Sequence, residues 1–327
     1  MKRRKLGGQG LEVAEIGLGC MGMSQMYGAF DEAENVATLH RALELGVDFF
    51  DTAEIYGPFT NEELLGRALA GRRHEVAIAT KFGFVIEDGK PGGTDSRPGH
   101  ILEVVEASLR RLRTDHIDLL YQHRVDPAVP MEDVAGAVAG LIAAGKVRYF
   151  GLSEVGVANL RRAHAVCPVS AVQSEFSLWE RNLETDVLPA MRELGVGLVP
   201  FSPLGRGFLT GAVKRAEDYE EGDYRRNDPR YQGANFDANM RAVEVVRSVA
   251  ARHGANAAQV ALAWVLAQGD DVVPIPGTKR VDRLTENVAA ADLALSAADL
   301  AELDAALPAG GTAGPRYGER MMAMVDR

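Results

Sequence analysis

Short apolar runs alternate with longer amphipathic stretches along most of the chain. Several runs are apolar throughout, which is typical of strands that are buried on both faces of a parallel sheet. Before the first run, residues 5–7 and 11–16 flank a glycine-rich turn and predict a β-hairpin. The apolar runs predict eight strands, at residues 16–19, 47–51, 76–80, 117–121, 147–151, 171–173, 196–201 and 272–274.

The stretches between the runs have the periodicity of amphipathic helices. Several end in glycine where a helix is expected to stop, as at Gly46, Gly145 and Gly195. The predicted helices span residues 31–44, 61–70, 98–113, 131–144, 157–165, 183–194, 236–253, 256–266 and 281–290.

Eight strands with helical crossovers predict an α/β protein with a parallel sheet, and closing that sheet gives a (β/α)8 TIM barrel. Such barrels commonly run beyond about 200 residues as one unit, so we expect residues 1–327 to form a single domain. The alternative is an open, doubly wound sheet. Residues 17–22 (GLGCMG) have the G-x-G-x-x-G spacing of such sheets, but no helical pattern follows, so we reject a dinucleotide fingerprint.

Two segments depart from this rhythm. Residues 214–234, after the seventh strand, are polar and contain Tyr219, Tyr224 and Tyr231. Loops of this length are uncommon unless they are functional or disordered, so a lid over a ligand and a disordered excursion both remain open. The chain from Leu307 onward is rich in glycine, and we expect it to be mobile.

Composition narrows the class of protein. The net charge of −10 argues against nucleic acid or an anionic membrane as the main partner. Two cysteines are too few for a disulfide framework and fit a reducing, cytoplasmic location. The basic N-terminus lacks the apolar run of a signal peptide, and no run is long enough for a membrane span. The seven histidines lack metal-site spacing, so we expect no metal.

Four polar residues fall at or just after the ends of predicted strands, where barrel active sites lie: Asp51, Tyr56, Lys81 and His123. Each has an ordinary alternative, such as a turn cap for Asp51 or a satisfied core imidazole for His123. Together they form a coherent acid catalyst. Lys81 is expected to lower the pKa of Tyr56, Asp51 to hold Lys81, and His123 to polarise a carbonyl.

The motifs around these residues resemble those of the aldo-keto reductases. They are residues 51–57 (DTAEIYG), 61–66 (NEELLG), 80–83 (TKFG) and 119–124 (LLYQHR), and the resemblance extends from about residue 3 to about residue 305. It implies an NADP-dependent oxidoreductase acting on CH–OH groups. Tyr56 would be the proton donor, Asp51 and Lys81 would tune it, His123 would orient the substrate, and NADPH would supply the hydride.

The resemblance also implies the cofactor-binding residues. Ser153 and Gln173 would bind the carboxamide, and Phe201 would stack on the nicotinamide, although Phe201 has a barrel-core aromatic as its alternative. Glu154 departs from the family, which often has Asn or Arg there, so its role stays open. The remaining implied contacts are Gly19, Cys20, Met21, Asp51, Ser202, Pro203, Leu204, Gly205, Arg206, Gly277, Lys279, Arg283, Glu286 and Asn287.

Lys279 and Arg283 also have a direct physical interpretation. They surround the start of a predicted helix, which already favours anions, and two cations there suit the 2′-phosphate of NADP. The alternative is that they are solvated helix charges.

Three functions remain open. The first is an NADPH-dependent reductase of a small carbonyl substrate. The second is a redox-sensing regulatory subunit like the potassium-channel β subunits, which often have Asn in place of His123, so the histidine favours an enzyme. The third is a dehydrogenase that works in the oxidising direction. The sequence leaves open whether the protein is a monomer or a homo-oligomer.

Overall fold

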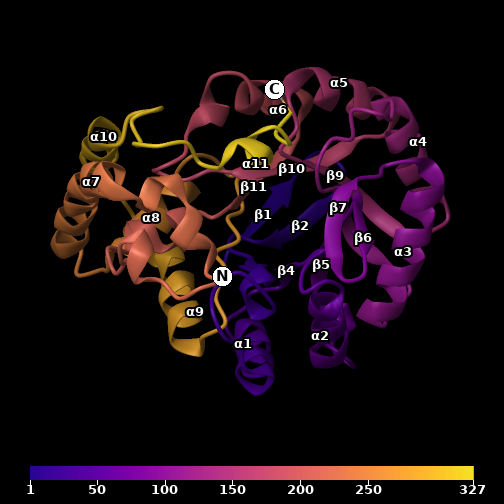
Figure 1. Cartoon of the computed structure of the whole chain (residues 1–327), viewed down its shortest axis with the longest axis horizontal. Helices are drawn as coiled ribbons and strands as arrows, with labels where there is room; N and C mark the ends of the chain where they lie inside the picture. Colours follow the sequence, from indigo (N-terminus) through magenta and orange to yellow (C-terminus); the bar gives the residue numbers. More distant parts are fainter. Residues whose placement is uncertain (327) are drawn as a thin grey trace.

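The computed structural model describes residues 1–326 and shows a (β/α)8 barrel (Figure 1). Its parallel sheet has the strand order β11-β10-β9-β8-β5-β4-β3. The six longer strands coincide with apolar runs of the sequence, and their first residues differ from the predicted ones by at most two. The strands are β3 (Leu18–Gly19), β4 (Phe49–Asp51), β5 (Ala77–Phe82), β8 (Ile117–Gln122), β9 (Val147–Ser153), β10 (Val169–Glu175) and β11 (Gly197–Phe201).

The eighth segment closes the barrel without forming a regular strand. Val273 N donates to Leu198 O on one side (2.9 Å), and Gly17 N donates to Pro274 O on the other (2.9 Å). Pro274 and Pro276 have no N–H, so they cannot donate hydrogen bonds back to the carbonyls of the segment that contains β3. On this side the ladder therefore has hydrogen bonds in one direction only. The expected strand at 272–274 is therefore reduced to isolated bridges.

Alternating residues of each strand face two different cores. One set fills the inside of the barrel and includes Phe49, Ala79, Leu119, Tyr121, Ala171 and Val199. The other set packs against the helices and includes Phe50, Ile78, Leu120, Val172 and Leu198. Both faces of the sheet are buried, which is why the strands are apolar throughout. The N-terminal hairpin, β1 (Arg3–Leu6) and β2 (Leu11–Ala14), adds Leu6, Leu11 and Val13 to the inner core and covers the bottom of the barrel.

The helices surround the sheet as expected, but two starts are shifted: α7 begins at Gly233, three residues before the predicted start at 236, and α6 begins late. The prediction of a helix from residue 183 is wrong, because α6 starts at Val187 after a short 3-10 turn. Pro189 is tolerated only in the first turn of a helix. The helices are α1 (Glu32–Glu44), α2 (Thr60–Ala68), α3 (Pro98–Leu112), α4 (Met131–Ala143), α5 (Val157–Val166), α6 (Val187–Leu194), α7 (Gly233–Arg252), α8 (Ala257–Leu266), α9 (Val281–Val288), α10 (Ala297–Ala306) and α11 (Glu319–Met322).

Besides the short helix α11, two features were not predicted. A second hairpin, β6 (Phe84–Glu87) and β7 (Lys90–Thr94), follows β5, and α10 follows the barrel. None of the helices within residues 1–326 is long and apolar enough to cross a lipid bilayer.

The long loop and the C-terminal segment are both packed against the barrel. Within residues 214–234, Asp228, Arg230 and Tyr231 are almost fully buried, so the loop is not a disordered excursion. The C-terminal segment crosses the barrel from α10 to the start of α5 (Figure 1), where Asp326 accepts hydrogen bonds from Gly156 N (2.9 Å) and Asn159. The expectation of a mobile tail is therefore wrong, because polar contacts that leave no periodic signal in the sequence dock it.

Candidate functional site

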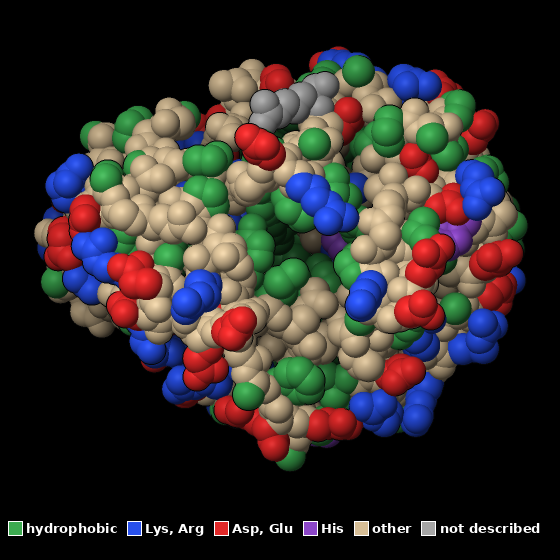
Figure 2. Space-filling view, viewed as in Figure 1, with side chains coloured by type: hydrophobic (Ala, Val, Ile, Leu, Met, Phe, Trp, Pro, Cys, Tyr) green, Lys and Arg blue, Asp and Glu red, His purple; other side chains and the backbone are tan. Residues whose placement is uncertain are grey.

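The polar residues named from the sequence gather at the carboxyl ends of the barrel strands. Asp51 ends β4, Lys81 lies one residue before the end of β5, and His123 directly follows β8. Tyr56 stands in the turn between β4 and α2. In the same view as Figure 1, the surface is hollowed at its centre and apolar side chains surround the hollow (Figure 2).

Lys81 is the centre of the group and is fully buried. Its Nζ donates to Asp51 Oδ1 (2.5 Å), to the carbonyl of Thr52 (2.7 Å) and to Tyr56 Oη (3.2 Å). Asp51 also accepts from Gln173 Nε2 (2.6 Å), so both carboxylate oxygens are occupied. The ammonium is therefore fixed, with one of its three hydrogens directed at the tyrosine oxygen.

Protonation states follow from burial and from this pairing. Burial disfavours the charged form of Lys81, but Asp51 and Tyr56 outweigh it and raise its pKa. Burial also raises the pKa of Tyr56, and Lys81 offsets this only in part. The expectation of a lowered tyrosine pKa is therefore wrong in its net direction, because desolvation outweighs the cation. Tyr56 holds its proton at neutral pH.

His123 faces Tyr56 edge-on, with ring centroids 5.9 Å apart, and packs on its other side against Phe84 (5.0 Å). Burial, together with the charges of Arg124 and Lys81, holds its pKa well below the ordinary value. The imidazole is therefore neutral and can donate one hydrogen bond.

Three of the implied cofactor residues line the neighbouring strands. Ser153 ends β9, Gln173 lies opposite it in β10, and Phe201 ends β11. Gln173 has its amide NH2 bound to Asp51, which leaves the carbonyl end for another partner. Ser153 and Gln173 are buried, while Phe201 is partly exposed.

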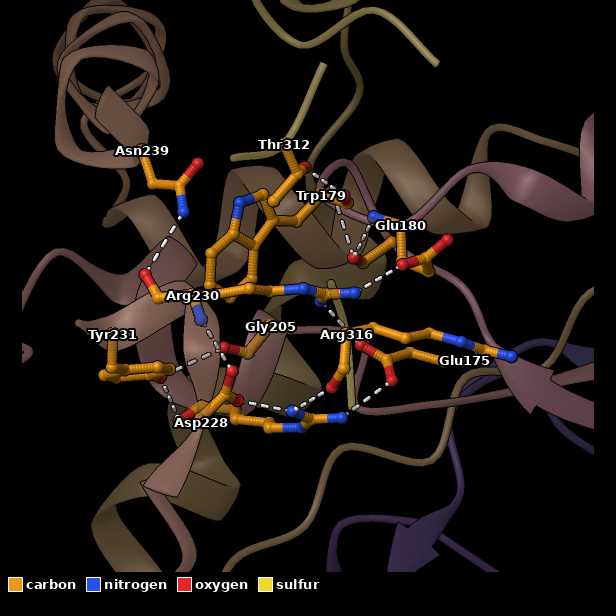
Figure 3. A network of polar contacts seen from close by, with 12 residues as sticks. Glu175, Trp179, Glu180, Gly205, Asp228, Arg230, Tyr231, Asn239, Thr312 and Arg316 are labelled. Carbon is orange, nitrogen blue, oxygen red and sulfur yellow. Dashed lines mark hydrogen bonds and ion pairs between the residues drawn. The ribbon is translucent and has the colours of Figure 1, made fainter. Parts of the chain in front are cut away.

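Cys20 and Arg206 lie in less accessible places. Burial raises the pKa of the Cys20 thiol, and its Sγ contacts Leu18 O (3.6 Å). Residues 202–207 form a tight turn, and the Arg206 guanidinium turns away from solvent. It binds Glu175 (2.9 Å) and Asp228 in a network of charged side chains (Figure 3). Ser202 and Leu204 are partly exposed, whereas the side chain of Arg206 is committed to this network.

Five further implied residues lie on α9 or just before it. Gly277 is exposed beside Gly19, with which it forms a parallel bridge. Arg283 pairs with Glu286 (2.8 Å), whereas Asn287 is buried. Lys279 donates to the carbonyls of Tyr27 (2.9 Å) and Ala29 and makes no ion pair with the described residues. Glu34 and Asp223 act on its charge, but neither forms an ion pair with it.

Glu154 has a structural partner that its sequence position did not reveal. It adopts a positive φ (56°), its carboxylate accepts from Glu175 N (2.9 Å), and it pairs with Arg316 of the C-terminal segment. Its backbone carbonyl accepts from Asp326 N (3.1 Å). Glu154 thus anchors the segment that crosses the barrel.

Comparison with known proteins assigns the chain to a family. A sequence model of the Aldo/keto reductase family matches residues 15–308. A probable aldo-keto reductase of Glycine max is 44% identical over 315 residues, which are 96% of this chain and 91% of that protein. The chain belongs to the aldo/keto reductase family.

Solved structures agree with this assignment. A glycerol dehydrogenase of Gluconobacter oxydans has a TM-score of 0.86 at 30% identity, covering 97% of this chain and 98% of that one. An aldo-keto reductase of Bacillus halodurans, in its holo form, has a TM-score of 0.80 at 28% identity, covering 98% and 99%. Aldo/keto reductases generally bind a nicotinamide cofactor, and this chain is an oxidoreductase of carbonyl or alcohol substrates.

This aldo/keto reductase also has a buried residue near the site to which sequence reasoning assigned no role. The Glu54 carboxylate accepts from Gly83 N (3.0 Å) and Phe84 N (3.3 Å), and Phe84 in turn packs on His123. Burial raises the pKa of Glu54 to about 7. In the sequence, the only sign that Glu54 lies near the site was its position two residues before Tyr56.

Proposed function

We propose that this aldo/keto reductase reduces aldehydes or ketones to alcohols with NADPH and that Tyr56 is the proton donor. One observation carries the proposal. The Tyr56 oxygen accepts a hydrogen bond from Lys81, and its own O–H donates to no acceptor among residues 1–326. A neutral phenol with a free proton, beside a neutral imidazole, is suited to protonate a carbonyl oxygen.

Each side chain then has a distinct part in the reaction. When bound, the nicotinamide supplies the hydride to the carbonyl carbon. Tyr56 gives its proton to the carbonyl oxygen, and Lys81 stabilises the phenolate that forms. Asp51 fixes Lys81, and neutral His123 donates a hydrogen bond that orients the carbonyl. In the reverse direction, the same phenolate accepts a proton from an alcohol. Because the chain is similar to a glycerol dehydrogenase, alcohol oxidation is measured as well.

The first experiment measures NADPH oxidation by the purified protein with a panel of small aliphatic, aromatic and dicarbonyl substrates. A parallel assay supplies alcohols and NADP+. We expect turnover of at least one class of carbonyl. Tight NADPH binding with no turnover in either direction would instead favour a regulatory subunit.

The residues at the start of α9 fit the 2′-phosphate of NADP. We expect Lys279→Ala combined with Arg283→Ala to raise the dissociation constant of NADPH about 10- to 100-fold, because two charge-assisted contacts are lost. NADH, which lacks this phosphate, should weaken by less than about threefold. Quenching of protein fluorescence measures both constants.

A charge-matched control is Arg161→Ala with Arg162→Ala on α5, where both arginines are exposed and paired with glutamates. We expect it to leave both cofactors unchanged. An equal loss of NADPH and NADH affinity in the Lys279/Arg283 variant would disprove the assignment of the phosphate to this edge.

A further inference from the structure

Arg124 is a buried guanidinium with no acidic partner among the described residues. Its side chain follows His123 at the end of β8 and is only 6% exposed. Nη1 donates to the carbonyl of His123 (2.5 Å) and to Ser153 Oγ (3.2 Å). Nε is enclosed without a partner, and Nη2 makes no hydrogen bond within residues 1–326 and is not one of the enclosed atoms. Several of its donors therefore lack an acceptor.

The other buried arginines nearby differ from Arg124 in this respect. Arg206 and Arg230 pair with Glu175, which lies among the polar contacts of Figure 3, and Arg316 pairs with Glu154. The network contains four carboxylates and three arginines, so it has one negative charge in excess. This charge lowers the free-energy cost of burying the Arg124 guanidinium without contacting it. None of those carboxylates accepts a hydrogen bond from Arg124, and a buried charge without a close partner is costly.

The charge of Arg124 acts on the reacting groups. It contributes to the lowered pKa of His123 and acts on Tyr56 in the same sense as Lys81 does. Asp51 pairs with Lys81, whereas Arg124 acts on Tyr56 without an ion-pair partner among the described residues.

We propose that Arg124 binds the anionic group of the substrate, and that the protein therefore prefers aldehydes or ketones that carry a carboxylate. This rests on the proposed carbonyl reduction and specifies its substrate. Nη2 is the donor of Arg124 that is left for a carboxylate oxygen of a substrate whose carbonyl binds Tyr56 and His123. A planar guanidinium matches a carboxylate better than an ammonium does.

The test compares two aldehydes that differ in charge, 4-carboxybenzaldehyde and methyl 4-formylbenzoate, with wild type and Arg124→Met. We expect wild type to prefer the acid. In Arg124→Met, kcat/KM should fall about 10- to 100-fold for the acid and less than about threefold for the ester. The control Arg148→Met removes an exposed arginine that pairs with Asp118 at the other end of the barrel, and it should change neither value.

The outcomes separate this inference from the proposed function. Reduction of the ester without a preference for the acid would overturn the role of Arg124 and leave the reductase activity standing. The role of Arg124 would also be overturned if Arg124→Met lowered kcat/KM equally for both aldehydes and weakened NADPH binding in a fluorescence titration. In that case Arg124 would support cofactor binding through Ser153. Reduction of neither aldehyde by wild type would overturn the inference, and NADPH binding without turnover across the whole panel would overturn the proposed function as well.

Discussion

Tyr56→Phe is expected to lower kcat by about 100- to 10,000-fold, the usual contribution of a positioned general acid. The substitution removes only the hydroxyl, which makes a single hydrogen bond of 3.2 Å, to Lys81. Lys81 keeps Asp51 and the Thr52 carbonyl as partners, so the site should stay folded. NADPH binding should therefore change by less than about threefold, because the loss is confined to the reacting oxygen.

The matched control is Tyr149→Phe, which removes a tyrosine hydroxyl from β9 near the N-terminal hairpin. It should retain nearly full turnover. Steady-state kinetics with the best carbonyl of the panel measures kcat, and a fluorescence titration measures the cofactor. Loss of turnover and of cofactor binding in equal measure by Tyr56→Phe would show that Tyr56 supports the site without donating the proton.

The regular part of the barrel could be predicted because its signal is local. Strands buried on both faces must be apolar at every position, and such runs stand out between helical stretches. The eighth strand was expected as regular, yet Pro274 and Pro276 interrupt its ladder. The β6–β7 hairpin and the docked C-terminal segment were missed, because exposed strands and polar docking contacts have no apolar periodicity.

The candidate site divides in the same way. Asp51, Lys81 and His123 could be found because a polar residue at the end of an apolar strand is conspicuous. The pairing of Arg206 with Glu175 and Asp228 could not be predicted, because those partners lie 31 and 22 residues away, at the end of β10 and in the long loop. The sequence also could not show that Arg124 has no acidic partner among the described residues, because this depends on every segment that packs around its side chain.

The charge network beside the site leads to a second large effect. Glu175, buried in β10, accepts from Arg206 Nη2 (2.9 Å) and from Arg230 Nη1 (2.9 Å). Burial disfavours its charged form, but Arg206, Arg230 and Arg316 outweigh it and lower its pKa (Figure 3). One carboxylate thus joins the turn after β11 to the long loop, and the charge of Arg316 from the C-terminal segment acts on it without a direct contact.

Glu175→Gln is expected to lower the free energy of unfolding by about 3–5 kcal/mol, because it leaves buried guanidinium groups without their shared counter-charge. Urea denaturation followed by circular dichroism measures this. The control Glu193→Gln breaks an exposed pair with Arg161 and should cost less than about 1 kcal/mol. Since the folded pKa of Glu175 lies below 4.5, its contribution is present above that pH and is lost as the pH falls through the folded value. Equal stability of the two variants at pH 7 would contradict the view that this network fixes the loops around the site.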